Sequence, residues 1–158
     1  EKVCLIMKKK TGPAAMIAAM LEGIEAEDLI SQALACFRCI SWRVLVNRPD
    51  IIMGGGQYNK IGADAGDEYS LSAPCDVSEC DAFISHSWLD DGQQKWEALK
   101  AWCEEFQRVH ERPPTLWLDK VCINQADIKK DLQCLPIYLA GSDRLVILSG
   151  PTYTSRLW

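Results

Sequence analysis

Polar side chains that could take part in chemistry follow two short apolar runs in the second half of the chain. The first run, residues 82–84, leads into a histidine flanked by two serines, and the second, residues 115–118, leads into an acid and a polar loop. In open α/β folds, ligands bind outside the carboxyl ends of parallel strands. We therefore expect a ligand or a protein partner to contact the residues at these ends, which are Ser85, His86, Ser87, Trp88, Asp119, Lys120, Asn124 and Gln125.

The chemistry of these candidates is open, and none is predicted to be catalytic. His86 between serines suggests a hydrolase, but the Gly-x-Ser-x-Gly pattern is absent and no acid is placed to orient the imidazole. Asp119 could stabilise positive charge on a ribose, or it could cap its own loop. Trp88 could stack on a base or pack in the core. Asn124 and Gln125 could bind a ligand or a partner, or close their own loop.

Eight cysteines raise the question of metals and disulfides. Cys36 and Cys39 form a C-x-x-C pair, and Cys75 and Cys80 form a looser pair. A zinc site needs four converging ligands, and no histidine lies beside the second pair, so we expect no metal, with redox pairing as an alternative. Without a secretory signal, the cysteines favour reduced thiols in an intracellular compartment such as the cytosol or a plastid stroma.

The overall composition excludes several classes of protein. Seventeen basic residues against 22 acidic residues give a net charge of −5, which argues against nucleic acid as a partner. No apolar run reaches the roughly 18 residues that a membrane span needs. Peripheral association with a membrane stays open because lysines occupy positions 8–10. An apolar share of 48% is typical of a globular domain.

Alternating strand and helix patterns place the candidate residues in residues 81–158. The strand at 81–85 is followed by a helix from Asp90 or Asp91 that ends before Pro113, and then by the strand at 115–118. A second helix runs from Asp127 towards Gly141 with a break at Pro136, and a third strand spans 144–149. The order β-α-β-α-β predicts a parallel sheet with right-handed crossovers.

The first half of the chain has a different texture. We expect a helical region at 1–48, with helices beginning near positions 13 and 25, and a Gly/Pro-rich linker or irregular loop at 49–80. The second helix carries apolar residues at helical spacing, which form either a core face or a partner-docking face. These interface candidates are Leu29, Ala33, Phe37 and Ile40.

Three segments of the α/β region resemble successive motifs of the Toll/interleukin-1 receptor (TIR) domain superfamily. They are DAFISHS at 81–87, TLWLD at 115–119 and GSDRLVILSGPTYTSRLW at 141–158. LWLDKVCINQADI at 116–128 is also similar to the signature of the fungal heterokaryon incompatibility domain, a relative with the same core. The resemblance covers about half of the chain and implies a flavodoxin-like parallel sheet, here partial and preceded by the helical region.

The resemblance also implies two activities, self-associating signalling and cleavage of NAD by a subset of members. In catalytic members a glutamate lies in a pattern like Ser-x-x-Trp-Cys-x-x-Glu; Ser155 and Trp158 match its start, and the sequence stops before the glutamate. We therefore expect a C-terminally incomplete, non-catalytic interaction or scaffold module without a cofactor, which binds a protein partner or itself within a larger protein or assembly. The alternatives are an NAD⁺ nucleosidase whose glutamate lies beyond residue 158, with NAD as substrate, and a purely structural subunit.

Overall fold

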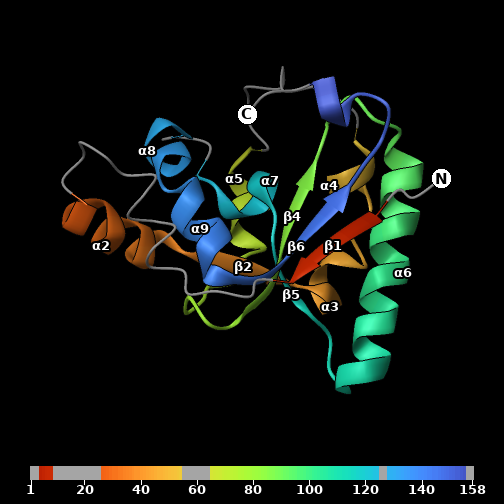
Figure 1. Ribbon diagram of the computed structural model, residues 1–158, viewed down its shortest axis with the longest axis horizontal. Helices are drawn as coiled ribbons and strands as arrows, with labels where there is room; N and C mark the ends of the chain where they lie inside the picture. Colours follow the sequence, from red (N-terminus) through yellow and green to blue (C-terminus); the bar gives the residue numbers. More distant parts are fainter. Residues whose placement is uncertain (1–3, 9–25, 55–64, 125–127, 156–158) are drawn as a thin grey trace.

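A computed structural model describes residues 4–8, 26–54, 65–124 and 128–155 of the chain (Figure 1). Its centre is a six-stranded mixed sheet in the order β1-β6-β4-β5-β2-β3. The strands are β1 (Cys4–Lys8), β2 (Arg38–Ser41), β3 (Ala73–Pro74), β4 (Cys80–His86), β5 (Thr115–Trp117) and β6 (Ser142–Leu148).

The three strands predicted from the second half of the chain form the parallel centre of this sheet. β4 lies in the middle and pairs in parallel with β5 on one side and with β6 on the other. All seven residues of β4 are buried, which fits the apolar run at its centre, Ala82, Phe83 and Ile84. The predicted parallel arrangement of these three strands is confirmed.

The sheet as a whole does not have the flavodoxin order, and this part of the prediction is wrong. A flavodoxin-type sheet has the order 2-1-3-4-5, whereas here antiparallel strands from earlier in the chain flank the parallel centre. β1 pairs with β6, β2 pairs with β5, and β3 pairs with β2, all antiparallel. The fold is therefore a mixed α/β fold with one mixed sheet and several helices.

The expectation of a purely helical region at 1–48 also needs correction. Helix α2 (Ala26–Cys36) begins near the predicted position, but the chain then enters β2 and the short helix α3 (Trp42–Leu45). Ile40 lies opposite Leu116 of β5, so sheet pairing overrides the helical spacing seen in the sequence. The helix expected near position 13 lies outside the described residues.

Helices lie on both sides of the sheet (Figure 1). The long helix α6 (Gly92–His110) lies on one side, and α8 (Ile128–Gln133), α9 (Leu135–Gly141) and α2 lie on the other. The predicted break near Pro136 is confirmed: α8 ends at Gln133, and Pro136 sits in the first turn of α9. No described helix is long and apolar enough to cross a membrane.

The stretch between 49 and 80 contains α4 (Asp50–Met53), α5 (Ala65–Ser70) and β3. Ile51 and Ile52 belong to the hydrophobic core, so this stretch packs against the rest of the fold where it is described. After β6, a 3₁₀ turn spans Tyr153–Ser155.

A disulfide joins Cys39 to Cys75, which corrects the expectation that the cysteines are reduced thiols. The bond does not fit a compartment that keeps all thiols reduced. Of the other described cysteines, Cys36 is partly exposed and four are buried, namely Cys80, Cys103, Cys122 and Cys134. The C-x-x-C spacing therefore did not identify the bonded pair, which links β2 to the residue after β3.

Candidate functional site

The carboxyl ends of β4, β5 and β6 bring together segments that lie far apart in the sequence. β4 and β6 end side by side, with His86 opposite Leu148, and the first turn of α6 begins at the same edge (Figure 1). β5 leads directly into the short helix α7 (Asp119–Cys122). We call this edge the strand-end site, because most of the predicted ligand contacts lie on it.

Hydrogen bonds join the end of β4 to the segment after β6. The Ser85 hydroxyl lies 2.8 Å from the Tyr153 hydroxyl, and Ser87 Oγ lies 2.7 Å from Thr152 Oγ1. Asp90 Oδ1 accepts from both the backbone N–H and the hydroxyl of Thr152, at 2.8 and 2.9 Å. Because Thr152 donates its hydroxyl proton to Asp90, the Ser87 hydroxyl must be the donor to Thr152. Both serine hydroxyls are thus engaged inside the fold.

Gly150 makes this closure possible. A Cβ atom at this position would lie 2.4 Å from Cγ of Asp90, far inside van der Waals contact. The close approach of backbone to carboxylate therefore requires glycine here. Asp90 holds the segment after β6 in place, a role that the sequence suggested only as a possible helix cap; Asp91 caps α6 instead, accepting from Gln94 N at 2.8 Å.

A buried lysine supplies the positive charge of the site. Lys95, in the first turns of α6, is 1% exposed, and its ammonium donates to the Ser87 carbonyl at 2.9 Å. The same ammonium lies 5.5 Å from the centre of the Trp88 ring, within range of a cation–π interaction. Burial lowers the pKa of Lys95, while the carboxylates of Asp90 and Asp119 oppose this shift.

Asp119 closes the β5 side of the site. Its carboxylate accepts from Trp88 Nε1 at 3.2 Å and from the backbone N–H of Lys120 at 2.7 Å. Burial raises the pKa of Asp119 to about 6, although these hydrogen bonds and nearby lysines favour the charged form. The predicted role as a cap of its own loop is present, together with a link to Trp88 that the sequence could not specify.

His86 is buried and held by ring packing. It is 3% exposed, and its ring meets that of Trp88 edge to face at 4.3 Å between centres. Burial and the nearby charge of Lys95 lower the pKa of His86 to about 3, so the imidazole is neutral at physiological pH. Nε2 of His86 and Oδ2 of Asp90 are buried and make no hydrogen bond in the described part of the chain. The hydrolase interpretation of His86 gains no support, because both flanking serines are engaged elsewhere.

The remaining predicted residues lie on the segment that follows β5. Lys120 forms an ion pair with Glu68 at 2.9 Å, and the backbone N–H of Asn124 donates to Asp131 at 2.9 Å. Gln125 lies outside the described residues. The structure therefore brings five of the eight candidates into one network, namely Ser85, His86, Ser87, Trp88 and Asp119, and it adds four residues that sequence analysis did not single out, namely Asp90, Lys95, Thr152 and Tyr153.

The four interface candidates lie in the protein's own core. Leu29, Ala33, Phe37 and Ile40 are all buried, and they belong to the same hydrophobic cluster as the residues of β4 and β5. Exposed apolar side chains lie elsewhere. Among the residues whose side chains the structure describes, the most exposed large apolar one is Leu89, with 64% of its surface accessible, in the turn between β4 and α6.

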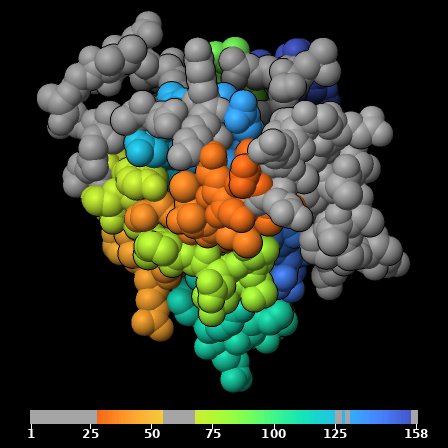
Figure 2. Space-filling model, turned by 90° about the vertical axis from the view of Figure 1, so that its left-hand side faces the viewer, coloured from red at the N-terminus to blue at the C-terminus, as the bar shows by residue number. Residues whose placement is uncertain are grey.

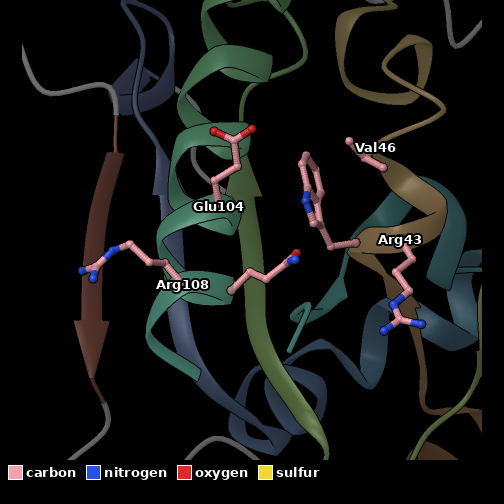
Figure 3. A pocket seen from close by; sticks show the side chains of 6 residues that line it. Arg43, Val46, Glu104 and Arg108 are labelled. Atoms are coloured by element: carbon pink, nitrogen blue, oxygen red, sulfur yellow. The ribbon is translucent and has the colours of Figure 1, made fainter. Parts of the chain in front are cut away.

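A separate groove of about 570 Å³ lies between α3 and α6 (Figure 3). It is lined by Trp42, Arg43, Val46, Glu104, Gln107 and Arg108. Glu104 is nine residues beyond Lys95 on α6, or about 14 Å along the helix axis, so this groove is distinct from the strand-end site.

Among the described residues, no group of three or more histidine, cysteine or acidic side chains could hold a metal ion. The expectation of no metal site stays a prediction for the whole chain. In comparisons with known proteins, no family model, no curated protein and no solved structure matches this chain.

Proposed function

We propose that this chain is a non-catalytic, TIR-like protein-interaction or scaffold module that works within a larger protein or assembly. The three motifs that resemble TIR segments coincide with β4, β5 and β6 and with their carboxyl ends. These three strands are parallel and form the centre of the sheet, in the order β5-β4-β6. The antiparallel strands on both sides are a departure from that pattern.

The closed strand-end site is the observation that carries this proposal. A catalytic edge needs side chains free to contact a substrate, whereas here the hydroxyls of Ser85 and Ser87 bond to Tyr153 and Thr152. His86 and Lys95 are almost fully buried. These contacts favour a rigid surface over a substrate-binding cleft, and we call this surface, formed by the strand-end site and the turn at residues 87–91, the platform.

The platform presents an exposed leucine to solvent. The Leu89 N–H donates to Ser87 Oγ at 3.3 Å, and the Asp90 N–H donates to the Ser87 carbonyl at 3.3 Å. These two hydrogen bonds fix the backbone of the turn. A turn whose backbone is already fixed loses little backbone entropy on binding, which favours Leu89 as an interface anchor. We propose that the module associates with itself or with a protein partner through this turn.

Analytical ultracentrifugation across a dilution series tests the self-association arm of this proposal. The wild-type chain should show an average mass that rises with concentration, and Leu89→Asp should lower this association at least tenfold. Val109→Asp is the matched control, because Val109 is also well exposed but lies near the far end of α6. A monomeric wild type at every concentration, or equal loss in both variants, would contradict self-association through the turn.

One observation favours the NAD⁺ nucleosidase as a second candidate. Asp119 is a carboxylate at a strand end with a pKa raised to about 6, and perturbed carboxyls of this kind are enriched at active sites. Incubation of the chain with NAD⁺, followed by chromatography for nicotinamide, separates the two proposals. We expect no release; release that Asp119→Asn abolishes would replace the interaction module with an enzyme.

A further inference from the structure

Residues 68–75, which we call the strap, cross the outside of α7. Glu68 forms the ion pair with Lys120, and the Ser72 hydroxyl donates to the Val121 carbonyl at 2.7 Å. Ser72 and Val121 are both buried by this contact region. Figure 2 shows yellow-green residues of this part of the chain at the surface, beside the orange residues of the α2 region. The strap therefore covers the helix that follows β5 and begins with Asp119.

Arg38 of β2 holds the middle of the strap. Its guanidinium lies 4.3 Å above the centre of the Tyr69 ring, and its Nε donates to Ser72 Oγ at 2.8 Å. A second guanidinium nitrogen donates to the carbonyls of Tyr69 and Ser72. All of these contacts come from the side chain of Arg38. They position the strap, but they are not the repeated backbone hydrogen bonds of paired β-strands.

Backbone pairing between the strap and β2 is short. The register pairs Arg38 with Pro74 and Cys39 with Ala73, and proline has no N–H to donate. One further bond runs from Cys75 N to the Phe37 carbonyl at 3.1 Å. Two paired positions at a sheet edge do not form a stable hairpin by themselves.

The disulfide closes the end of the strap. Cys39 is in β2, Cys75 is the last residue of the strap, and their Cα atoms are 5.8 Å apart across 36 residues of sequence. Cys75 is partly exposed, while Cys39 is buried, so Cys75 is the more accessible of the two cysteines. The covalent bond thus adds to the polar contacts of the strap and to the packing of Leu71 against the hydrophobic core.

We propose that the Cys39–Cys75 disulfide is a redox-controlled latch, and that its reduction by a dithiol releases the strap from α7. A thiolate of the dithiol attacks Cys75 Sγ, which breaks the bond to Cys39 and forms a mixed disulfide. The second thiol of the reductant then attacks the mixed disulfide, so the reductant leaves as its own disulfide and both cysteines become thiols. Release exposes Lys120 and the Val121 backbone. This device goes beyond the proposed function and does not depend on self-association at Leu89.

Hydrogen–deuterium exchange of the full chain, with and without dithiothreitol, tests the latch. Reduction should speed exchange in residues 69–75 and 121–123 by about 100-fold, because closure of the strap is no longer covalent. Amides of β4 and β6 should change by less than about threefold, since their ladder does not involve the strap. The double variant Cys39→Ser, Cys75→Ser should exchange like the reduced protein and ignore dithiothreitol.

Cys36→Ser is the matched control, because it removes a nearby free thiol and leaves the latch intact; its response to dithiothreitol should equal that of the wild type. An equal rise in the exchange rates of the strap and of β4 would show that the disulfide stabilises the whole fold, and this result would overturn the proposal. Unchanged exchange on reduction would overturn it as well, and so would alkylation of both Cys39 and Cys75 in the folded protein before any reduction.

Discussion

Lys95 is the buried cation of the strand-end site, and we predict that its charge contributes to the stability of the fold. Its ammonium is buried, donates to the Ser87 carbonyl, and lies near the carboxylates of Asp90 and Asp119. Lys95→Met keeps the length and the apolar stem of the side chain but removes the charge. The variant removes a charged hydrogen bond to the Ser87 carbonyl and leaves the two nearby carboxylates without this cation, which should cost about 1.5 to 3 kcal/mol.

Urea unfolding followed by circular dichroism measures this cost. With an m-value of about 1.5 kcal/mol/M for a chain of this size, the unfolding midpoint of Lys95→Met should fall by about 1 to 2 M. Lys100→Met on the same helix is the control. Its half-exposed ammonium is 3.8 Å from Glu104, and a surface pair of this kind contributes at most about 1 kcal/mol.

A double variant separates charge balance from packing. Asp90→Asn removes one carboxylate but retains an oxygen that can accept from Thr152. In the Lys95→Met background, Asp90→Asn should therefore recover about 1 to 3 kcal/mol, the range expected for coupled neighbours. A loss below about 1 kcal/mol for Lys95→Met, or strict additivity of the two substitutions, would refute the account of a mutually neutralising buried cluster.

Three further predictions concern stability and its dependence on pH. Asp81→Asn breaks the paired bonds to Arg112 at 2.6 and 2.7 Å and should cost about 1.5 to 3 kcal/mol in urea unfolding at pH 7. These bonds lower the pKa of Asp81 below its unfolded value of about 3.9, although burial opposes this shift. The variant's loss of unfolding free energy should therefore be full above pH 4 and should vanish as the pH falls through the folded pKa. A constant loss at all pH values would contradict this. Gly150→Ala should lower the free energy of unfolding by about 1 to 3 kcal/mol, since its Cβ would overlap the Asp90 carboxylate, and a neutral effect would show that the segment after β6 moves freely. Burial raises the folded pKa of Asp119 to about 6, so this group favours folding below about pH 4 and loses that contribution as the pH rises through 6. Tryptophan fluorescence should follow the same titration near pH 6, and Asp119→Asn should abolish it; a titration that persists in the variant would assign it to another group.

The central strands were predictable because local burial leaves a pattern in the sequence. β4 is buried along its whole length, so the apolar run at 82–84 marks it without knowledge of its neighbours. Asp91 and the break before Pro136 likewise mark helix ends through local backbone chemistry. In contrast, Ile40 fits both a helical face and a strand, and only its pairing with Leu116 decides for the strand.

The location of the candidate site could be predicted from the sequence, but the contacts within it could not. Parallel strands must end at a common edge, so Ser87, Trp88 and Asp119 were expected to lie close together. No sequence pattern marked the residues that contact these three side chains. Lys95 lies within a helix and resembles any surface lysine, and Thr152 lies 62 residues beyond Asp90, with which it bonds.

The cysteines also separate what the sequence determines from what only the tertiary structure decides. The sequence determines their number and their spacing, but eight cysteines allow many pairings, and the adjacent pair at 36 and 39 is not the one bonded. Only the antiparallel register of β2 and β3 brings Cys39 and Cys75 within bonding distance.

The sequence by itself determined which segments become the central strands and helices, because hydrophobic periodicity and helix caps act over a few residues. The tertiary structure decided the mixed order of the sheet, the disulfide and the closure of the strand-end site. Each of these depends on contacts between residues more than 30 positions apart, such as Ser85 with Tyr153 and Trp88 with Asp119. Such contacts depend on the register of paired strands and on complementary polar atoms in three dimensions, which no local pattern encodes.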